Sequence, residues 1–467
     1  MDGLTTALRE AAHKVPGSFL NGLPDFLAAK PPFQRSLICG LKEAWEAADR
    51  EHAIETDWDH GWKNIVTFFE QLIGDAKFWQ RAPATDHMRD WIASAVADFL
   101  QAGSKNDARA YEITLLPRTQ ALIGVLLEKA RGPEQPSKDP VTQALNWPRG
   151  RAIEALFSQA LRACRAGDRA TGSHQVQWNE IMQLFEAELT KCEHANYEFS
   201  TFCGLYLAQL LYMDQKWTKA QIQNIFPSKF PLNSICALEG LAYAAFTRPV
   251  YSLLAEPDIL SRALRYDLRG RIGREKLLER IGAAYLWGDE PLDSPRFSYI
   301  FEAGNIEDLQ TMTRVFWMVR GQPISTEQKQ LVIDYWDRCL AWSQRLSEPP
   351  AELFSSLSTL SCYLATADGK ERELLEAVAP YVQVDRNVYG FVEELVRLVD
   401  VSPDGVSSVL ARVIKSRVPD FDYKDQLMEL LRALAAKGKK QDVISYAERL
   451  RNLPGMQELF DGLTRDS

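Results

Sequence analysis

The sequence predicts an all-α fold built from stacked helical hairpins. Apolar residues recur at the 3.6-residue spacing of amphipathic helices along most of the 467 residues. Glycine and proline interrupt this pattern at short intervals, as they do at the ends of helices. Alternating Val, Ile and Thr patterns, which are typical of strands, are scarce, and no Asn-Gly or Asp-Gly hairpin lies between strand-forming residues.

One of the clearest helical patterns begins at Asn146. Asn146 is a favourable N-cap residue, Pro148 is tolerated in a first helical turn, and Gly167 is a plausible stop signal. Between them the spacing predicts one buried stripe, formed by Ile153, Leu156, Phe157, Ala160, Leu161 and Cys164.

Two further helices have recognisable start signals. Ser325 and Gln328 form a capping-box pattern, which predicts a helix whose apolar residues are Leu331, Val332, Tyr335, Trp336, Cys339 and Leu340. Ser402 and Pro403 open a third helix, whose buried stripe is predicted to contain Val406, Val409, Leu410 and Val413.

The segment 132–140, GPEQPSKDP, is predicted to be a linker because it contains three prolines and no large apolar side chain. We therefore expect an N-terminal helical subdomain at 1–131 and a helical-repeat array at 141–467. No strict period supports TPR or ankyrin consensus repeats, whereas an irregular α-solenoid of HEAT- or TPR-like hairpins fits the spacing. A non-repeating helical domain remains the alternative.

Composition and motifs argue against several function classes. The formal net charge is −9, which disfavours nucleic acid or an anionic membrane as the partner of the whole surface. The sequence contains no Walker A loop, no GxGxxG, no HExxH and no GxSxG motif. We therefore expect a non-enzymatic protein, with no cofactor and no catalytic residues.

The lack of a recognisable targeting signal and the pattern of cysteines lead us to expect a cytoplasmic protein. The N-terminal residues lack the apolar core of a signal peptide, and the most apolar stretch, 202–213, is too short to span a bilayer. The seven cysteines are odd in number, widely spaced and without a CxxC pair, so we expect reduced, mostly buried thiols.

Two sequence clusters contain residue types that can bind metals, but neither spacing matches a regular site, so we predict no metal. The residues concerned are His52, Asp57, Asp59 and His60 in one cluster, and Cys192, His194 and Cys203 in the other.

A basic segment at 261–280 is the most distinctive charged feature. Its arginines suit the recognition of carboxylates or phosphates, although ion pairs with neighbouring acidic helices would explain them equally well. Trp287 lies beside it in a predicted loop. We predict a protein-binding surface that contains Arg262, Arg265, Arg269, Arg271 and Trp287.

The segment 144–156, ALNWPRGRAIEAL, resembles a pattern in the helical C-terminal regions of large bacterial antiphage defence proteins, namely STAND/Avs-type NTPases and SIR2-domain proteins. The matching residues are Asn146, Pro148, Arg149, Gly150, Ala152, Glu154, Ala155 and Leu156. The resemblance covers about a dozen residues.

This resemblance implies a sensor array that recognises a phage protein, or an effector subunit, in antiviral defence. The sequence shows neither a P-loop nor a Rossmann-like NAD pocket, so the NTPase or NADase activity of those families is not transferred to it. We expect a separate effector domain to provide the response. The alternative is a constitutive helical-repeat scaffold that holds a host complex together.

Overall fold

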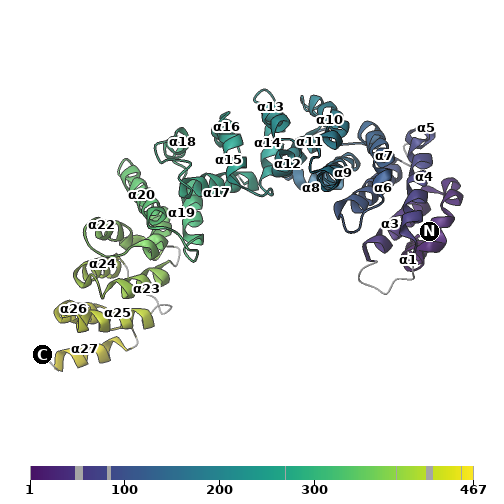
Figure 1. Ribbon diagram of the computed structural model, residues 1–467. Coiled ribbons are helices and arrows are strands. Elements are labelled where there is room, and N and C mark those ends of the chain that lie inside the picture. Colours follow the sequence, from purple (N-terminus) through teal and green to yellow (C-terminus); the bar gives the residue numbers. More distant parts are fainter. Residues whose placement is uncertain are drawn as a thin grey trace. The chain divides into compact units, whose positions relative to one another are not determined.

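The computed structural model describes residues 2–47, 56–80, 86–268, 270–384, 387–416, 424–453 and 455–465. Within these ranges every regular element is a helix, and no β-strand is present (Figure 1). The all-α prediction is therefore confirmed for this part of the chain. The described helices include none that is long and apolar enough to cross a bilayer.

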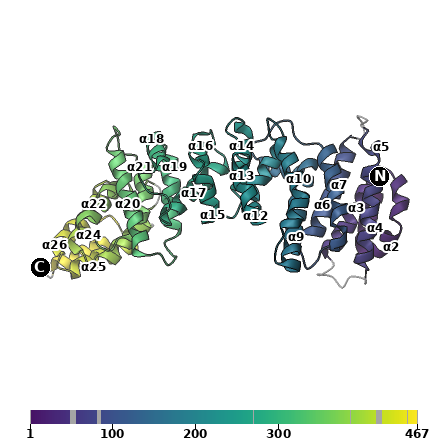
Figure 2. The ribbon, with the colours of Figure 1, turned by 45° about the horizontal axis from the view of Figure 1, so that its top comes forward.

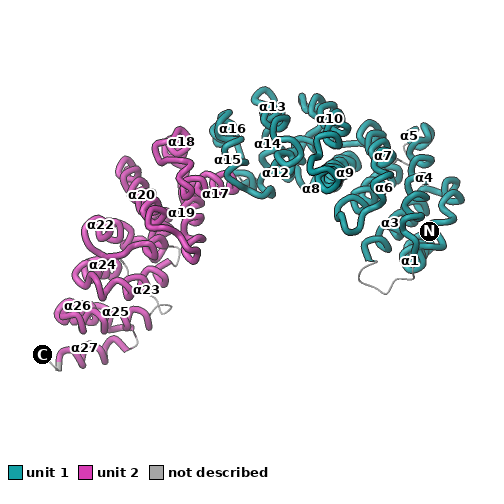
Figure 3. The backbone as a smooth tube through the Cα atoms, viewed as in Figure 1, with its two compact units in different colours: residues 1–274 teal, residues 275–467 magenta. Residues whose placement is uncertain are grey.

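The structure forms two compact units, residues 1–274 and residues 275–467 (Figure 3). Unit 1 contains α1 (Asp2–Lys14), α2 (Pro16–Asn21), η1 (Leu23–Ala28), α3 (Pro31–Ala47), α4 (Trp58–Gly74), α5 (Ala76–Trp79), α6 (Asp86–Lys105), η2 (Ile113–Leu115), α7 (Leu116–Lys129), α8 (Pro140–Asn146), α9 (Pro148–Thr171), α10 (Gln175–Thr190), α11 (Tyr197–Leu205), α12 (Leu207–Met213), α13 (Gln215–Ile225), α14 (Pro231–Leu241), α15 (Arg248–Ala255) and α16 (Ile259–Arg265). The boundary falls inside α17 (Ile272–Leu286).

Unit 2 continues with the remaining helices. They are α18 (Pro295–Ala303), α19 (Ile306–Met318), α20 (Thr326–Ser343), α21 (Ala351–Ser358), η3 (Thr359–Tyr363), α22 (Gly369–Val378), η4 (Ala379–Tyr381), α23 (Val388–Leu398), α24 (Pro403–Ser416), α25 (Lys424–Ala436), α26 (Lys440–Arg449) and α27 (Met456–Arg465).

Within each unit, the helices pack as hairpins in two layers. In unit 1, α1, α3, α6 and α9 pack in series, and α4 and α7 form a second layer over them (Figure 2). In unit 2, α20, α22, α24 and α26 pack in series, while α19 packs on α21 and α23 on α25. Each unit is thus a solenoid in which neighbouring hairpins bury one another's apolar faces.

The segment 132–140, predicted to link two domains, lies inside unit 1. Helix α9, which follows it, packs against α6 and α7, which precede it. These contacts continue the layers of unit 1 across the proline-rich segment, so the division between the two units lies elsewhere in the chain.

The predicted apolar stripes are buried except at Leu161, Leu331 and Leu340, which are half-buried, but two of the predicted helix ends are wrong. Asn146 is the last residue of α8, where its Nδ2 donates to the carbonyl of Thr142 at 2.8 Å, and Trp147 is the N-cap of α9. Gly167 lies inside α9, which ends at Gly172 with a left-handed φ of 74°. Gly167 is buried, and a Cβ there would lie 3.0 Å from the Cα of His174. Gly167 therefore does not end the helix, and its lack of a side chain allows the residues at the start of α10 to pack closely against α9.

The other predicted start signals are confirmed. Ser325 and Gln328 form both bonds of the capping box at the start of α20, and Val332, Tyr335, Trp336 and Cys339 are buried behind it. Helix α24 begins at Pro403 and buries the predicted valine and leucine stripe. Half of the residues in the apolar segment 202–213 are buried, and the segment forms two helices, α11 and α12, which are separated at Tyr206.

The residues of the defence-type pattern in 144–156 lie in the framework of unit 1. A Cβ on Gly150 would lie 1.9 Å from the carbonyl oxygen of Ala144, so glycine permits the tight corner between α8 and α9. Arg149 forms an ion pair with the buried Glu188 of α10, and its Nε donates to Asn196 at 3.1 Å. Ala152, Ala155 and Leu156 are fully buried. Most of this pattern therefore supports packing.

Candidate functional site

A polar groove lies on unit 1 where α1, α3 and α6 meet the corner between α8 and α9. Its cavity has a volume of about 280 Å³. The charged and aromatic side chains that line it, named here the polar groove, are Arg9, Arg35, Lys42, Glu43, Trp91, Asp98 and Arg151.

Helical spacing and one glycine explain why these side chains lie together. Lys42 and Glu43 lie seven and eight residues after Arg35 on α3, and Asp98 lies seven residues after Trp91 on α6, so each set follows one helical face. A Cβ on Gly40 would lie 2.4 Å from the backbone oxygen of Arg9. The absence of that Cβ allows α1 to approach α3 closely.

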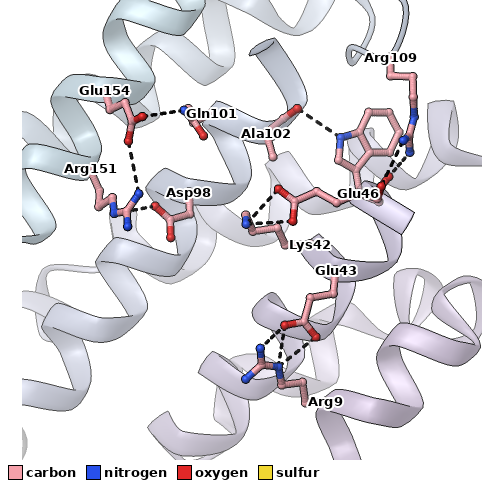
Figure 4. Close-up of polar contacts among 11 residues, drawn as sticks. Arg9, Lys42, Glu43, Glu46, Asp98, Gln101, Ala102, Arg109, Arg151 and Glu154 are labelled. Atoms are coloured by element: carbon pink, nitrogen blue, oxygen red, sulfur yellow. Dashed lines mark hydrogen bonds and ion pairs between the residues drawn. The ribbon is translucent and has the colours of Figure 1, made fainter. Parts of the chain in front are cut away.

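Ion pairs join neighbouring helices and turns along the groove (Figure 4). Arg9 of α1 pairs with Glu43 of α3, and its Nε donates to the two carboxylate oxygens at 2.9 and 3.0 Å. On α3, Lys42 Nζ lies 3.1 Å from Glu46. Both pairs are largely exposed to solvent, so each contributes little to stability.

Two carboxylates share one guanidinium at the α9 side of the groove (Figure 4). Arg151 lies 3.3 Å from Asp98 and 3.3 Å from Glu154, and Gln101 Nε2 donates to Glu154 at 3.0 Å. Burial raises the pKa of Asp98 and of Glu154, and the charge of Arg151 partly opposes that shift. Arg151 therefore already forms ion pairs within the protein.

Arg35 and Trp91 form a different kind of contact at this groove. The guanidinium carbon of Arg35 lies 5.2 Å from the centroid of the Trp91 ring, within the range of a cation–π interaction. Trp91 remains 50% exposed, which is unusual for a side chain of this size. No ion pair joins Arg35 to any residue that the structure describes. An exposed tryptophan beside an arginine without an ion pair is typical of an interface anchor.

A second cavity, of about 630 Å³, shares Glu43 with the polar groove and extends the charged surface along α3 and α6. Trp45 lines it, and its indole Nε1 donates to the carbonyl of Ala102 at 3.3 Å (Figure 4). The guanidinium of Arg109 lies 5.0 Å from the Trp45 ring. The groove and this cavity together offer mixed charges and aromatic rings instead of one uniform charge.

Three arginines of the predicted protein-binding surface, Arg262, Arg265 and Arg271, lie in the described part of unit 1. Arg262 Nη2 donates to the carbonyl of Phe226 at 2.8 Å, and Arg271 Nη1 donates to the carbonyl of Lys138 at 3.0 Å. Both arginines therefore tie unit 1 together, whereas Arg265 is exposed at the end of α16.

Two further residues were predicted for this surface. Arg269 lies outside the described residues. Trp287 is half-buried and belongs to unit 2.

Unit 2 carries an aromatic contact that the sequence did not reveal. Trp317 is 37% exposed, and the Arg320 guanidinium lies 3.6 Å from its ring centroid. This tryptophan lines a cavity of about 430 Å³ together with Gln310, Arg314 and Asn387. Trp317 directly follows Phe316, the last residue of the buried stripe of α19, so helical spacing alone does not show that Trp317 is exposed.

Several of the residues considered as metal ligands have structural roles of their own. Asp57 caps α4 by accepting from the backbone N–H of His60 at 3.0 Å. Cys192 and Cys203 are buried, which raises the pKa of both thiols and holds them protonated. His52 lies outside the described residues. Among the residues that are described, no three His, Cys, Asp or Glu side chains are grouped to hold a metal ion.

Comparison with known proteins assigns no family. No protein-family model matches the chain, and no curated protein matches it. Among solved structures, the chain is similar to one described as "Circular tandem repeat protein with novel repeat topology and enhanced subunit contact surfaces". The identity is 12% over 99% of this chain and 89% of that one, with a TM-score of 0.24. Values this low identify no relative.

Proposed function

We propose that this chain is a non-enzymatic protein-recognition module that binds its partner through the polar groove of unit 1. The exposed Trp91 beside Arg35 is the observation that carries this proposal. Tryptophan and arginine dominate the residues that contribute most to binding energy at protein interfaces. The helical layers beneath them hold both side chains on rigid elements, which limits the entropy lost on binding.

The neighbouring charges support a protein partner over a uniform polyelectrolyte. Carboxylates at Glu43, Asp98 and Glu154 alternate with Arg9 and Arg151 along the same surface. A phosphate backbone would meet these carboxylates as well as the arginines, so its binding would be opposed. A folded protein or a peptide can match a mixed pattern side chain by side chain.

For the biological role, we propose a sensor in bacterial antiviral defence that acts in the cytoplasm on a phage protein. The support is the resemblance of 144–156 to the helical regions of antiphage proteins, together with a surface suited to protein capture. The response would come from an effector domain distinct from these helical units. The alternative proposal, a constitutive scaffold for a host complex, is compatible with the same groove.

Site-specific photo-crosslinking tests these proposals in living bacteria. A photoreactive amino acid replaces Ser94, which lines the groove, and in a matched control it replaces Val176, which is 64% exposed on α10. We expect a phage protein to be crosslinked from position 94, only after infection, and not from position 176.

Two other results would change the interpretation. A host protein crosslinked from position 94 in both states would favour the scaffold. If position 94 captures nothing beyond what position 176 captures, in infected or uninfected cells, recognition through the polar groove is wrong.

A further inference from the structure

We infer that the polar groove recognises an acidic segment of the partner, with Arg35 binding a carboxylate and Trp91 packing against the neighbouring apolar atoms. This inference rests on the proposed function and specifies the chemistry of the ligand. It concerns one place on the surface, where Arg35 of α3 faces Trp91 of α6 at 5.2 Å.

Charge complementarity is the first argument. The charged side chains that line the groove are four cations, Arg9, Arg35, Lys42 and Arg151, and two anions, Glu43 and Asp98. The chain as a whole has a formal charge of −9. Glu46 and Glu154, which lie outside the lining, pair with Lys42 and Arg151, so the positive charge left without an ion pair is that of Arg35. This charge favours an acidic group at Arg35 itself.

The partners of the other cations single out Arg35. Arg9 is held by Glu43, Lys42 by Glu46, and Arg151 by Asp98 and Glu154. The same ion pairs also engage Glu43 and Asp98, the two acidic side chains that line the groove. Arg35 has no ion pair with a described residue, so its guanidinium can donate hydrogen bonds to a carboxylate of the partner without breaking an existing ion pair.

Trp91 adds a requirement for atoms beyond the carboxylate. Half of its surface is open to solvent, and burying a tryptophan is a large source of interface energy. A free phosphate or a lone carboxylate would leave that ring exposed. A peptide that carries an acidic residue next to an apolar residue would engage both Arg35 and Trp91.

Peptide selection on the full-length chain tests this inference. A random dodecapeptide library is panned on the immobilised wild-type protein and on the variants Arg35→Gln, Trp91→Ala and Arg265→Gln. The wild type is expected to enrich peptides with an Asp or Glu beside an apolar residue. A selected peptide, labelled with fluorescein, should then lose about tenfold or more in affinity with either groove variant.

The Arg265→Gln variant is the matched control because Arg265 is an exposed arginine of the same unit, outside the groove. It should bind the labelled peptide with wild-type affinity, and thermal melting checks that all the variants are folded. A wild-type selection without acidic enrichment would overturn the inference. So would equal loss with Arg265→Gln, or a single-stranded DNA oligonucleotide that displaces the peptide from the groove.

These outcomes are separable from those of the proposed function. Crosslinking from position 94 without acidic enrichment in the library would preserve protein recognition and reject the acidic ligand. Acidic enrichment without a crosslinked partner in cells would preserve the chemistry of Arg35 and Trp91 and remove support for the biological role.

Discussion

His174 and Asp168 are joined by a contact of 2.8 Å between Nδ1 and Oδ1, which ties the start of α10 to the last turns of α9. The other ring nitrogen, Nε2, lies 2.9 Å from the carbonyl oxygen of Met213, at the end of α12. Tyr212 also donates to Asp168, at 2.6 Å. Because both ring nitrogens face acceptors, the doubly protonated imidazolium fits this site best.

This arrangement predicts a stability that depends on the protonation of His174. Burial lowers the pKa of His174, but the bonds to Asp168 and Met213 outweigh it and raise the pKa above 6.5. The contribution of His174 is therefore fully present below pH 6.5 and is lost as the pH rises through its higher value in the folded state. The pKa of Asp168 is lowered by its bonds to Tyr212 and His174, so Asp168 stays ionised over this range.

Urea unfolding at a series of pH values measures this effect. The free energy of unfolding of the wild type should decrease above pH 6.5 relative to that of His174→Gln, which lacks the titrating ring. Parallel curves for the two proteins would show that His174 does not stabilise unit 1 through its charge.

Glu198 predicts a second pH dependence. Its side chain is 2% exposed in the first turn of α11, and its Oε1 has no hydrogen-bond partner among the described residues. Burial raises the pKa of Glu198 from 4.5 to about 7. The folded state therefore loses stability as the pH rises from 4.5 to about 7, because ionisation is harder inside the protein than in the unfolded chain.

The variant Glu198→Gln should remove that loss. Its free energy of unfolding at pH 8 should exceed that of the wild type by up to about 3 kcal/mol, and the advantage should shrink towards pH 5. Glu188→Gln is not an equivalent control because Glu188 pairs with Arg149 and Lys191. A constant difference between Glu198→Gln and the wild type at all pH values would contradict the prediction.

Helices α11 and α14 are predicted to depend on two glycines for their close contact. A Cβ on Gly204 would lie 1.8 Å from the carbonyl oxygen of Ala237, and one on Gly240 would lie 1.9 Å from that of Thr201. Because backbone atoms cannot move aside as side chains do, Gly204→Ala should cost about 1–3 kcal/mol or more. The urea midpoint of the full-length chain measures this loss.

Gly124 offers the matched control for this substitution. It lies inside α7, and a Cβ there would meet nothing within 4 Å. Gly124→Ala should therefore stabilise the protein by about 0.5–1 kcal/mol through helix propensity. Destabilisation by both substitutions to the same extent would mean that the α11–α14 contact is not the cause.

Arg262 and Arg265 are predicted to respond differently to the same substitution. Arg262 Nη1 lies 3.2 Å from Gln223 Oε1, and its Nη2 donates to the carbonyl of Phe226, so Arg262→Gln should cost about 1–2 kcal/mol. Arg265 is exposed, so solvent screens its interactions, and Arg265→Gln should change the free energy of unfolding by less than about 1 kcal/mol. Differential scanning calorimetry of both variants tests this contrast, and equal melting temperatures would refute it.

Features that depend on residues close together in the sequence were predicted well. The Ser325 capping box and the buried stripes behind Pro403 and Pro148 depend on bonds and spacings within one helix. The error at Asn146 also has a local origin: Trp147 precedes a proline, which favours the extended backbone that separates α8 from α9. Gly167 could not be placed from sequence, because the start of α10 that packs against it comes from a separate element.

The helical nature of the described chain and the apolar face of its clearest helices can be read from the amino-acid sequence, since both follow from contacts between residues three and four positions apart. Where the units divide, which arginines tie helices together and which tryptophans stay exposed depend on packing between helices that are distant in the sequence. Arg35 and Trp91 are separated by more than fifty residues, and no periodic pattern connects them. They meet because α3 packs against α6 in the layered fold, and that packing free energy is distributed over many side chains.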